Sequence, residues 1–458
     1  MDRPARRRAR LAARLMTDVV LGADSGTSGL KLAALDTTGA VVAEAEVGHD
    51  VDTPEVGWAQ TDVAVWRAAF DAALGRLDLA GHTVRALGLA GQMHGAVLVD
   101  GAGAALAPAL LWPDQRAAAQ VERWRGLADH DRAALANPLV PGMTGPLTAW
   151  LAEHRPDLVA RAAGVLLPKD ALRATLLPDA HPLVTDRSDA SATLLWDVPA
   201  DDWSAPALAL ARARAPEVRP SDEVVGTTVL RGVGEVPVVV GGADTPLALL
   251  ATGTASGLQV NLGTGVQLLR PGATPAPVLD PVVHTYADAG EGWYAMAALQ
   301  NGGLAWDWVR RVLGFDWAEL LATLEAPGAG GVRFAPWLTG ERGGVAGPDD
   351  RGAWTGLHPG TTRADLGRAA LEGVATAVAA AADLLGTADD APVVLTGGGA
   401  RTPAVQQLLA DALGRPVQHV QVRSASATGA ALLAARGVGL AVAPHRQLGP
   451  VVDPRVSG

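Results

Sequence analysis

The sequence predicts an α/β protein built from two lobes. Short apolar runs alternate with longer segments of helical periodicity along most of the chain, which is typical of α/β architecture. One local pattern also occurs twice, at residues 19–35 and 258–269: an apolar β-prone run, a Gly-Thr turn and a second apolar run. Glycine lets backbone N–H groups approach an anion, and threonine adds a hydroxyl donor. The repetition therefore indicates a phosphate clamp with one hairpin in each lobe; the alternative is two ordinary β-hairpins.

Length and composition bound the class of protein. The chain has 458 residues, more than a single core usually accommodates, and 49% of them are hydrophobic, so two or more domains are expected. The net charge of −11 argues against a nucleic-acid-binding surface. No uninterrupted apolar stretch is long enough to span a bilayer, so we expect no membrane partner. The absence of cysteine excludes disulfides and thiol chemistry and favours a cytoplasmic location.

The first hairpin carries an acid that the second lacks. Asp24 precedes the turn, so this lobe is predicted to meet a phosphate-bound Mg²⁺ directly or through its waters. The turn itself supplies three predicted nucleotide-binding residues: Gly26, Thr27 and Ser28.

Lysine occurs twice in the chain, at Lys31 and Lys169, against thirty-five arginines. Because arginine is a planar fork and lysine a compact point charge, the two lysines are expected at positions where the exchange fails. Lys31, on the strand that leaves the first turn, is a predicted nucleotide-binding residue. Lys169 is expected to support structure near a domain interface.

The second hairpin and the strand before it supply the next candidates. Its turn contains three predicted nucleotide-binding residues: Gly263, Thr264 and Gly265. A buried strand at residues 236–240 runs into a Gly-Gly-x-Asp turn that ends at Asp244. Thr245 and Pro246 then resemble an N-cap and a first-turn proline. Asp244 is therefore expected at a strand end and helix start, exposed in a cleft.

A third glycine turn follows the apolar run at residues 393–396. Three consecutive glycines form it: Gly397, Gly398 and Gly399. Bare backbone there lets adenine or a phosphate lie close, and the helix predicted from Thr402 as N-cap to Gly414 as stop favours an anion at its N-terminus. The alternative is a plain turn between strand and helix.

A cluster of hydrogen-bonding residues follows the strand at residues 87–91. Its members are Gln92, Met93, His94, Trp112 and Asp114. Paired donors and acceptors beside an apolar wall suit a polyol. We therefore predict that these residues bind a small sugar.

Together these stretches resemble a known family, the FGGY carbohydrate kinases, and within it the xylulokinases. Landmarks occur in the family's order from about residue 17 to residue 440. They include Asp24-Ser-Gly-Thr, Gly91-Gln-Met-His-Gly95, Leu166-Leu-Pro-Lys-Asp170, Thr185-Asp-x-Ser-Asp-Ala-Ser191, Gly241-Gly-x-Asp244, Leu262-Gly-Thr-Gly265, Gly340-Glu-Arg342 and Gly397-Gly-Gly-Ala400.

The resemblance implies two ribonuclease-H-like domains of the actin and sugar-kinase superfamily with a cleft between them. We expect a disordered extension or a misassigned start over residues 1–15 and a sugar-binding domain over 16–247. A nucleotide-binding domain over 248–445 and a tail over 446–458 complete the chain. The implied activity is transfer of a phosphoryl group from ATP with Mg²⁺ to D-xylulose.

The implied mechanism assigns the general base to Asp244 and a Mg²⁺ ligand to Asp24, because phosphoryl transfer needs a carboxylate to accept the hydroxyl proton. The resemblance also makes Met93 and His94 the sugar contacts. Closure of the two lobes would exclude water from the reaction.

Three departures from the family's pattern leave the sugar open. Thr245 stands where xylulokinases have asparagine, Leu147 where the family has lysine, and Pro113 where asparagine is usual. Thr245, a predicted substrate-binding residue, offers one hydroxyl in place of an amide. Another ketose or a polyol is therefore an alternative substrate. A non-enzymatic actin-like ATPase and a degenerate kinase acting as a sugar sensor are alternatives of another class, and a homodimer stays open.

Overall fold

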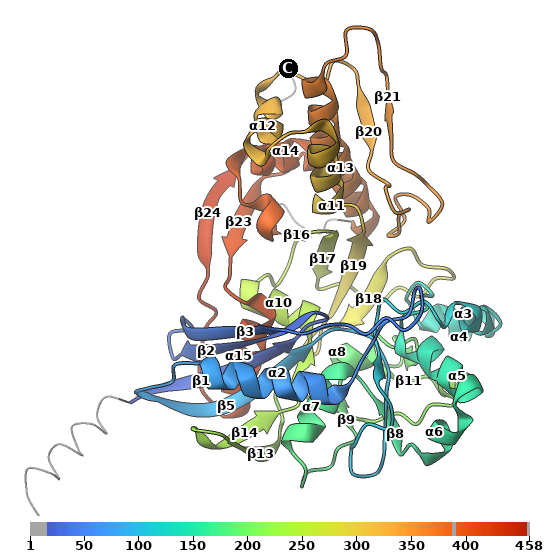
Figure 1. The fold of residues 1–458 in the computed structure, drawn as a ribbon, viewed down its shortest axis with the longest axis vertical. Coiled ribbons are helices and arrows are strands. Elements are labelled where there is room, and N and C mark those ends of the chain that lie inside the picture. The colour runs from blue at the N-terminus through green and yellow to red at the C-terminus, as the bar shows by residue number, and fades with distance from the viewer. Residues whose placement is uncertain (1–15, 387–390, 456–458) are drawn as a thin grey trace, which may run out of the picture.

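The computed structural model describes residues 16–386 and 391–455, and most of its strands form two sheets (Figure 1). The expectation for residues 1–15 lies outside this part of the chain. The first sheet has the order β13-β14-β5-β1-β2-β3, with β15 paired to β5. Its strands are β1 (Thr17–Ser25), β2 (Gly29–Asp36), β3 (Val41–Gly48), β5 (His82–Gly91), β13 (Val224–Leu230), β14 (Gly234–Val239) and β15 (Gly242–Ala243).

The second sheet has the order β18-β19-β17-β16-β22-β23-β24 and forms the upper part of Figure 1. Its strands are β16 (Gln259–Leu262), β17 (Val266–Pro271), β18 (His284–Ala287), β19 (Trp293–Leu299), β22 (Val393–Thr396), β23 (Val417–Gln421) and β24 (Gln447–Val452). The strand β24 lies within the segment expected to be a tail and pairs antiparallel with β23.

Both predicted hairpins are confirmed. The strands β1 and β2 pair antiparallel, as do β16 and β17. Each hairpin also has a parallel neighbour on its first strand, β5 beside β1 and β22 beside β16. The two halves of the chain therefore repeat one arrangement.

Helices cover the sheets and the regions beside them (Figure 1). In the first half they are α2 (Val63–Arg76), α3 (Ala118–Arg125), α4 (Asp129–Ala134), α5 (Thr144–His154), α6 (Pro156–Arg161), α7 (Pro168–Leu176), α8 (Arg187–Ala190), α9 (Ala205–Ala211) and α10 (Asp244–Thr252). In the second half they are α11 (Gly303–Leu313), α12 (Trp317–Ala322), α13 (Arg363–Leu385), α14 (Pro403–Leu413) and α15 (Ala425–Gly437).

Short pairs of strands complete the fold. They are β4 (Gln60–Thr61) with β7 (Ala109–Leu110), β6 (Val97–Val99) with β8 (Gly164–Leu166), β9 (Val184–Asp186) with β12 (Glu217–Arg219), β10 (Trp196–Asp197) with β11 (Asp202–Trp203), and β20 (Arg333–Ala335) with β21 (Ala353–Thr355).

Local signals explain several helix ends. The helix α14 has Thr402 as N-cap, a proline at its first position and Gly414 in the left-handed conformation, as predicted. The helix α10 starts two residues earlier than predicted, at Asp244, with Ala243 in place of Thr245 as N-cap. The reason is that the Asp244 Oδ1 oxygen accepts the Thr245 N–H at 2.7 Å, so the aspartate itself satisfies a donor of the first turn.

The helix α15 comes late in the chain but packs on β1 and β5 of the first sheet (Figure 1). Glycines in both strands make this close approach possible. A Cβ atom at Gly22 would lie 1.8 Å from the Ala427 carbonyl oxygen, and one at Gly88 would lie 2.0 Å from that of Ala430. The chain thus crosses back to the first sheet, through α15, before β24 joins the second.

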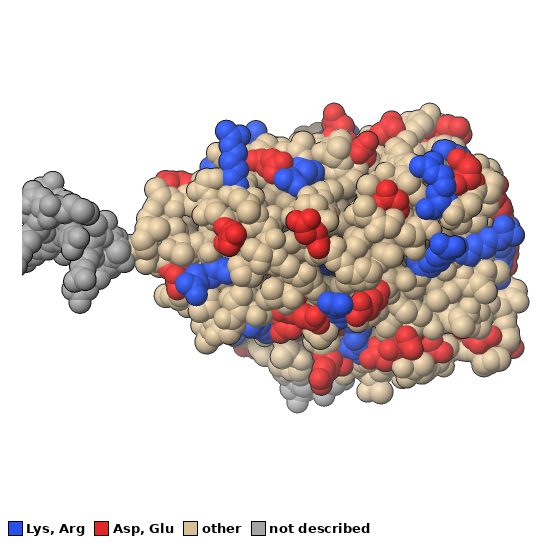
Figure 2. Space-filling view, turned by 90° about the horizontal axis from the view of Figure 1, so that it is seen from below, with Lys and Arg blue, Asp and Glu red and all other residues tan. Residues whose placement is uncertain are grey.

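Charges on the surface are mixed. On the face shown in Figure 2, blue basic side chains are scattered among red acidic ones and form no continuous stripe. Within the described part of the chain, every helix is too short or too polar to cross a membrane.

Candidate active site

Two cavities meet beside the first turn of α10. The larger cavity has a volume of about 380 Å³ and the smaller cavity about 230 Å³. Thr245 and Gln267 line both of them, and Asp244 lines the smaller one. A carboxylate therefore lies where the two cavities adjoin.

The smaller cavity collects most of the predicted sugar-binding residues. Residues from the first half of the chain that line it are Thr27, Gln92, Met93, His94, Trp112, Val140, Gly142, Met143, Asp244 and Thr245. Residues from the second half are Gln267, His284, Met296, Ala298 and Arg342. Both halves of the chain thus contribute walls to one polar cavity.

A chain of hydrogen bonds orders one wall of the smaller cavity. The Trp112 indole N–H donates to the Thr27 hydroxyl at 2.8 Å, and that hydroxyl donates to the Gln92 side-chain oxygen at 3.2 Å. Thr27, predicted on the nucleotide side, thus lies between two predicted sugar-binding residues. Thr27 lines the smaller cavity and does not line the larger one.

His94 presents a hydrogen-bond acceptor to the smaller cavity. Its Nδ1 lies 2.5 Å from the Ala192 carbonyl oxygen, which can only accept, so Nδ1 carries the proton and Nε2 is left as an acceptor. Burial lowers the pKa of His94 to about 4, so the ring is neutral. The residue adopts a positive φ of 66°, a conformation that costs energy for a non-glycine residue.

Asp114, predicted to bind substrate, is occupied elsewhere. Its oxygens accept the Ala59 N–H at 2.7 Å and the Arg116 backbone N–H at 2.8 Å, and they form a buried ion pair with the Arg116 guanidinium. Asp114 is not among the residues that line either cavity. It fixes the loop that carries Trp112.

The larger cavity is lined by polar side chains and by two of the three glycines of the third turn. Its walls include Lys31, Gln259, Asn261, Gln267, Thr396, Gly397, Gly398, Arg401, His419 and Ser424. Lys31 forms a half-exposed ion pair with Glu46 at 3.5 Å. Flat glycine backbone beside a lysine and an arginine can hold a planar base and its phosphates.

The remaining turn residues lie outside the walls of both cavities. These are Gly26, Ser28, Gly263, Thr264, Gly265 and Gly399. The Gly263 and Thr264 carbonyl oxygens accept N–H groups from the start of α11, so the second turn is tied to that helix. The Thr264 and Ser28 side chains are exposed.

Asp24 lies close enough to Asp244 to affect the pKa of that acid. Burial raises the pKa of Asp24 to about 6, although the charge of Lys31 opposes the rise. Burial, and then the charge of Asp24, raise the pKa of Asp244 to about 7. Two neighbouring carboxyl groups whose pKa values lie near neutral pH are typical of a reactive site.

Asp24 also fits a cation. Its Oδ1 oxygen is buried and accepts no hydrogen bond. Within residues 16–386 and 391–455, no group of three metal-ligating side chains occurs. A Mg²⁺ ion held here would therefore take its other ligands from phosphates and water, as Mg²⁺ commonly does.

Several lining residues were not among the sequence-based candidates. Asn261 could have been found, because it precedes the second Gly-Thr turn by the same spacing as Asp24 precedes the first. Arg342 belongs to a quoted landmark and lies 6.0 Å from the Trp112 ring. His284 and His419 carry no local signal, since only tertiary packing brings β18 and β23 to the cavities.

Comparisons with known proteins identify the family. The models of the N-terminal and C-terminal domains of the FGGY family of carbohydrate kinases match residues 19–251 and 258–438. A xylulose kinase from Escherichia coli (strain K12) is 32% identical over 446 residues, covering 93% of this chain and 91% of its own length. A glycerol kinase from Aromatoleum aromaticum (strain DSM 19018 / LMG 30748 / EbN1) is 33% identical over 448 residues, covering 92% and 90%. The solved structure of a xylulose kinase from Rhodospirillum rubrum has 26% identity and a TM-score of 0.87, over 96% of this chain and 95% of that one.

The chain belongs to the FGGY family of carbohydrate kinases. It is an ATP-dependent sugar kinase, and the predicted two-domain α/β fold is confirmed.

Proposed function

We propose that this protein transfers the terminal phosphoryl group of ATP to a terminal hydroxyl of D-xylulose, with Asp244 as the general base. One observation carries the proposal: Asp244 lines the smaller cavity at the place where Thr245 and Gln267 join it to the larger one. A hydroxyl in the smaller cavity and a phosphate in the larger one would then meet at this carboxylate.

The electrostatics support the role of base. A base works best when its pKa lies near the working pH, and the pKa of Asp244 is raised to about 7. The ionised carboxylate would accept the proton as the sugar oxygen attacks phosphorus. His94 would orient the sugar by accepting a hydrogen bond from a sugar hydroxyl at Nε2.

Asp24 is proposed to hold Mg²⁺, which when bound neutralises phosphate charge. Lys31 and Arg401 in the larger cavity would face the phosphates, and Gly397 and Gly398 would contact the nucleoside. A sugar bound in the smaller cavity would have a hydroxyl close to Asp244.

The names of the relatives favour D-xylulose as the substrate, and one of them also supports a polyol. The E. coli and R. rubrum proteins are named xylulose kinases, whereas the A. aromaticum protein is named a glycerol kinase. Thr245 lines both cavities. A threonine in place of asparagine would therefore change one hydrogen-bonding partner of the sugar. Another ketose or a polyol is the second candidate substrate.

The rivals of another class lack support from the site. A non-enzymatic actin-like ATPase needs no sugar cavity, yet Asp244 and His94 line one polar cavity here. A degenerate sugar sensor would form no ADP in response to sugar.

Replacing Asp244 by asparagine tests the proposal. The variant Asp244→Asn keeps the shape and hydrogen-bonding reach of the side chain but removes its basic oxygen. We expect kcat for sugar-dependent ADP formation to fall by roughly 10²- to 10⁴-fold, with ATP binding retained. A kcat for Asp244→Asn within threefold of the parent value would show that Asp244 is not the catalytic base.

The same assay, run with the parent protein on a panel of ketoses, polyols and sugar acids, identifies the substrate. Activity on glycerol or gluconate tenfold above that on every pentulose would overturn the assignment of D-xylulose.

A further inference from the structure

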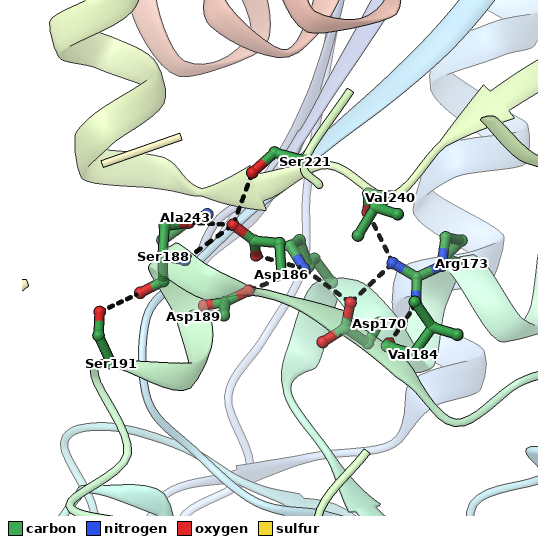
Figure 3. A network of polar contacts seen from close by, with 11 residues as sticks. Asp170, Arg173, Val184, Asp186, Ser188, Asp189, Ser191, Ser221, Val240 and Ala243 are labelled. Carbon is green, nitrogen blue, oxygen red and sulfur yellow. Dashed lines mark hydrogen bonds and ion pairs between the residues drawn. The ribbon is translucent and has the colours of Figure 1, made fainter. Parts of the chain in front are cut away.

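A buried cluster of charges lies near Val240 and Ala243, in the segment that precedes Asp244 (Figure 3). Lys169 Nζ lies 2.6 Å from Asp170 Oδ1, 3.0 Å from Asp186 Oδ1 and 3.0 Å from Asp189 Oδ2. Arg173 Nη1 lies 2.8 Å from the same Asp170 oxygen. We call these five residues the buried ion cluster; each side chain is at most 3% exposed. Charges buried this deeply are costly unless each is paired.

The geometry explains why residue 169 is a lysine in a chain that otherwise uses arginine. The compact ammonium group hydrogen-bonds Asp170 and lies within 3.0 Å of two further carboxyl groups, with which it forms ion pairs. The charge of a planar guanidinium is spread over a larger group and cannot lie this close to three carboxyl groups at once. Burial lowers the pKa of Lys169, but the three carboxylates outweigh that effect and hold the pKa above its ordinary value.

Two arms connect the buried ion cluster to the backbone that precedes Asp244. In the first, Asp186 Oδ2 accepts the Ser188 hydroxyl at 2.5 Å, and the Ser188 oxygen accepts the Ala243 N–H at 2.9 Å. In the second, Arg173 Nη1 donates to the Val240 carbonyl oxygen at 2.6 Å. Val240 and Ala243 flank the two glycines of the turn, so the cluster holds the turn at both ends.

The helix that carries Ser188 is itself anchored to the second sheet. The Ser191 hydroxyl donates to the Ser188 carbonyl oxygen at 3.0 Å and accepts the Ala287 N–H of β18 at 2.9 Å. Ser188 therefore has a defined position from which to fix the turn.

We propose that Ser188 and Arg173 are positioning residues, through which the buried ion cluster holds the Val240–Ala243 turn so that the Asp244 carboxylate reaches the smaller cavity. The inference rests on the proposed function, because it assumes that Asp244 is the base. None of the cluster residues lines the two cavities, so their effect on turnover must pass through the turn.

Ser188→Ala and Ser221→Ala form a matched pair for the test. Both hydroxyls are buried, and both donate to Asp186 Oδ2, Ser188 at 2.5 Å and Ser221 at 2.9 Å. Only the Ser188 oxygen also accepts the Ala243 N–H. The two variants thus lose the same bond to the cluster, but only Ser188→Ala removes a side-chain hydrogen bond to the turn. The Ser221 carbonyl oxygen, which accepts the Gly241 N–H at 2.9 Å, belongs to the backbone and stays in both variants.

We expect Ser188→Ala to lower kcat by roughly 10- to 100-fold, because a small displacement of a reacting group has effects on that scale. Ser221→Ala should stay within twofold of the parent. The KM for ATP and the thermal midpoint should be similar in the two variants. A kcat for Ser188→Ala within twofold of that for Ser221→Ala would overturn the proposal, whether both values stay high or both fall.

The double variant separates this proposal from the proposed function. Once Asp244→Asn has removed the base, adding Ser188→Ala should lower kcat no further, because both changes act on one group. Full activity of Asp244→Asn alone would reject the base instead, whatever Ser188→Ala does. A further additive loss in the double variant would reject positioning and leave the base intact.

Arg173→Lys tests the second arm and serves if Ser188→Ala fails to fold. The lysine keeps a cation near Asp170, but one ammonium cannot replace a guanidinium that also reaches the Val184 and Val240 carbonyl oxygens. The expected signature is the same: a lower kcat, an unchanged KM for ATP and no additional loss with Asp244→Asn. Unchanged turnover would overturn the proposal.

Discussion

The hairpins β1–β2 and β16–β17 share their antiparallel pairing and their Gly-Thr turn but differ in chemistry. Each is antiparallel, turns at Gly-Thr and lies beside a parallel strand whose carboxyl end leads into cavity-lining residues. One chemical difference is the cross-strand pair that lies next to the turn on the cavity side. Asp24 lies opposite Lys31 in the first hairpin, and Asn261 lies opposite Gln267 in the second.

This difference separates the roles of the two halves. The amides Asn261 and Gln267 hydrogen-bond each other at 3.2 Å and line the larger cavity without adding charge. Asp24 instead brings a carboxylate near Asp244, where it raises the pKa of that acid. A repeated scaffold thus concentrates its acids on one side of the cleft, where we propose that metal and proton chemistry occur.

The largest effect is expected when Asp24 of the first hairpin is replaced by asparagine, the residue at the equivalent position, Asn261, of the second hairpin. Asp24→Asn removes the proposed Mg²⁺ ligand while keeping the size of the side chain. We expect kcat to fall by roughly 10²- to 10³-fold, the scale of losing one preorganised electrostatic group. Turnover measured against Mg²⁺ concentration checks this result.

The reciprocal variant Asn261→Asp is its control. Added to Asp24→Asn, it restores the number of acids but places the carboxylate in the larger cavity, so activity should not return. Recovery of turnover in that double variant would break the distinction between the two hairpins.

The pair of acids in the first half should also cost stability. The pKa of Asp244 is about 7 in the folded protein against an ordinary value of 3.8, so the folded state keeps a proton that the unfolded chain releases. Stability from this group is therefore full below about pH 4 and is lost as the pH rises to about 7. Without Mg²⁺, Asp244→Asn should be more stable than the parent at pH 8 by about 4 kcal/mol, and nearly equal to it at pH 4.

Thermal midpoints at both pH values measure this difference. A variant less stable than the parent at pH 8 would instead make Asp244 a stabilising residue of the α10 N-terminus. That outcome would remove the electrostatic contrast between the two halves.

The smallest effect concerns the glycine turn that follows β22. A Cβ atom at Gly398 would meet nothing within 4 Å, so Gly398→Ala should leave stability unchanged. If the nucleotide lies against this backbone, the methyl group should weaken ATP binding about tenfold, or about 1.4 kcal/mol. Calorimetric titration with ATP checks this, and parent-like affinity would move the nucleotide away from the turn.

Gly397→Ala provides the contrast. Gly397 has a φ of 87°, and its Cβ would lie 2.5 Å from the Leu262 carbonyl oxygen. This variant should lose thermal stability before any effect on ATP is measured, because the backbone there requires glycine.

The sequence by itself determined the features that depend on neighbouring residues. Apolar runs, Gly-Thr turns and the Thr402-Pro403 start predicted both hairpins and α14, because strands, turns and caps are governed by local backbone preferences. The order of the landmarks identified the family, which the domain models bear out.

Only the tertiary structure decided what each side chain contacts. Thr27 lies with Gln92 and Trp112, which are 65 and 85 residues away in the chain, and Asp114 is engaged by Arg116. The return of α15 to the first sheet depends on close packing against Gly22 and Gly88. Such contacts follow from packing and hydrogen-bond satisfaction between distant segments, which no local pattern encodes.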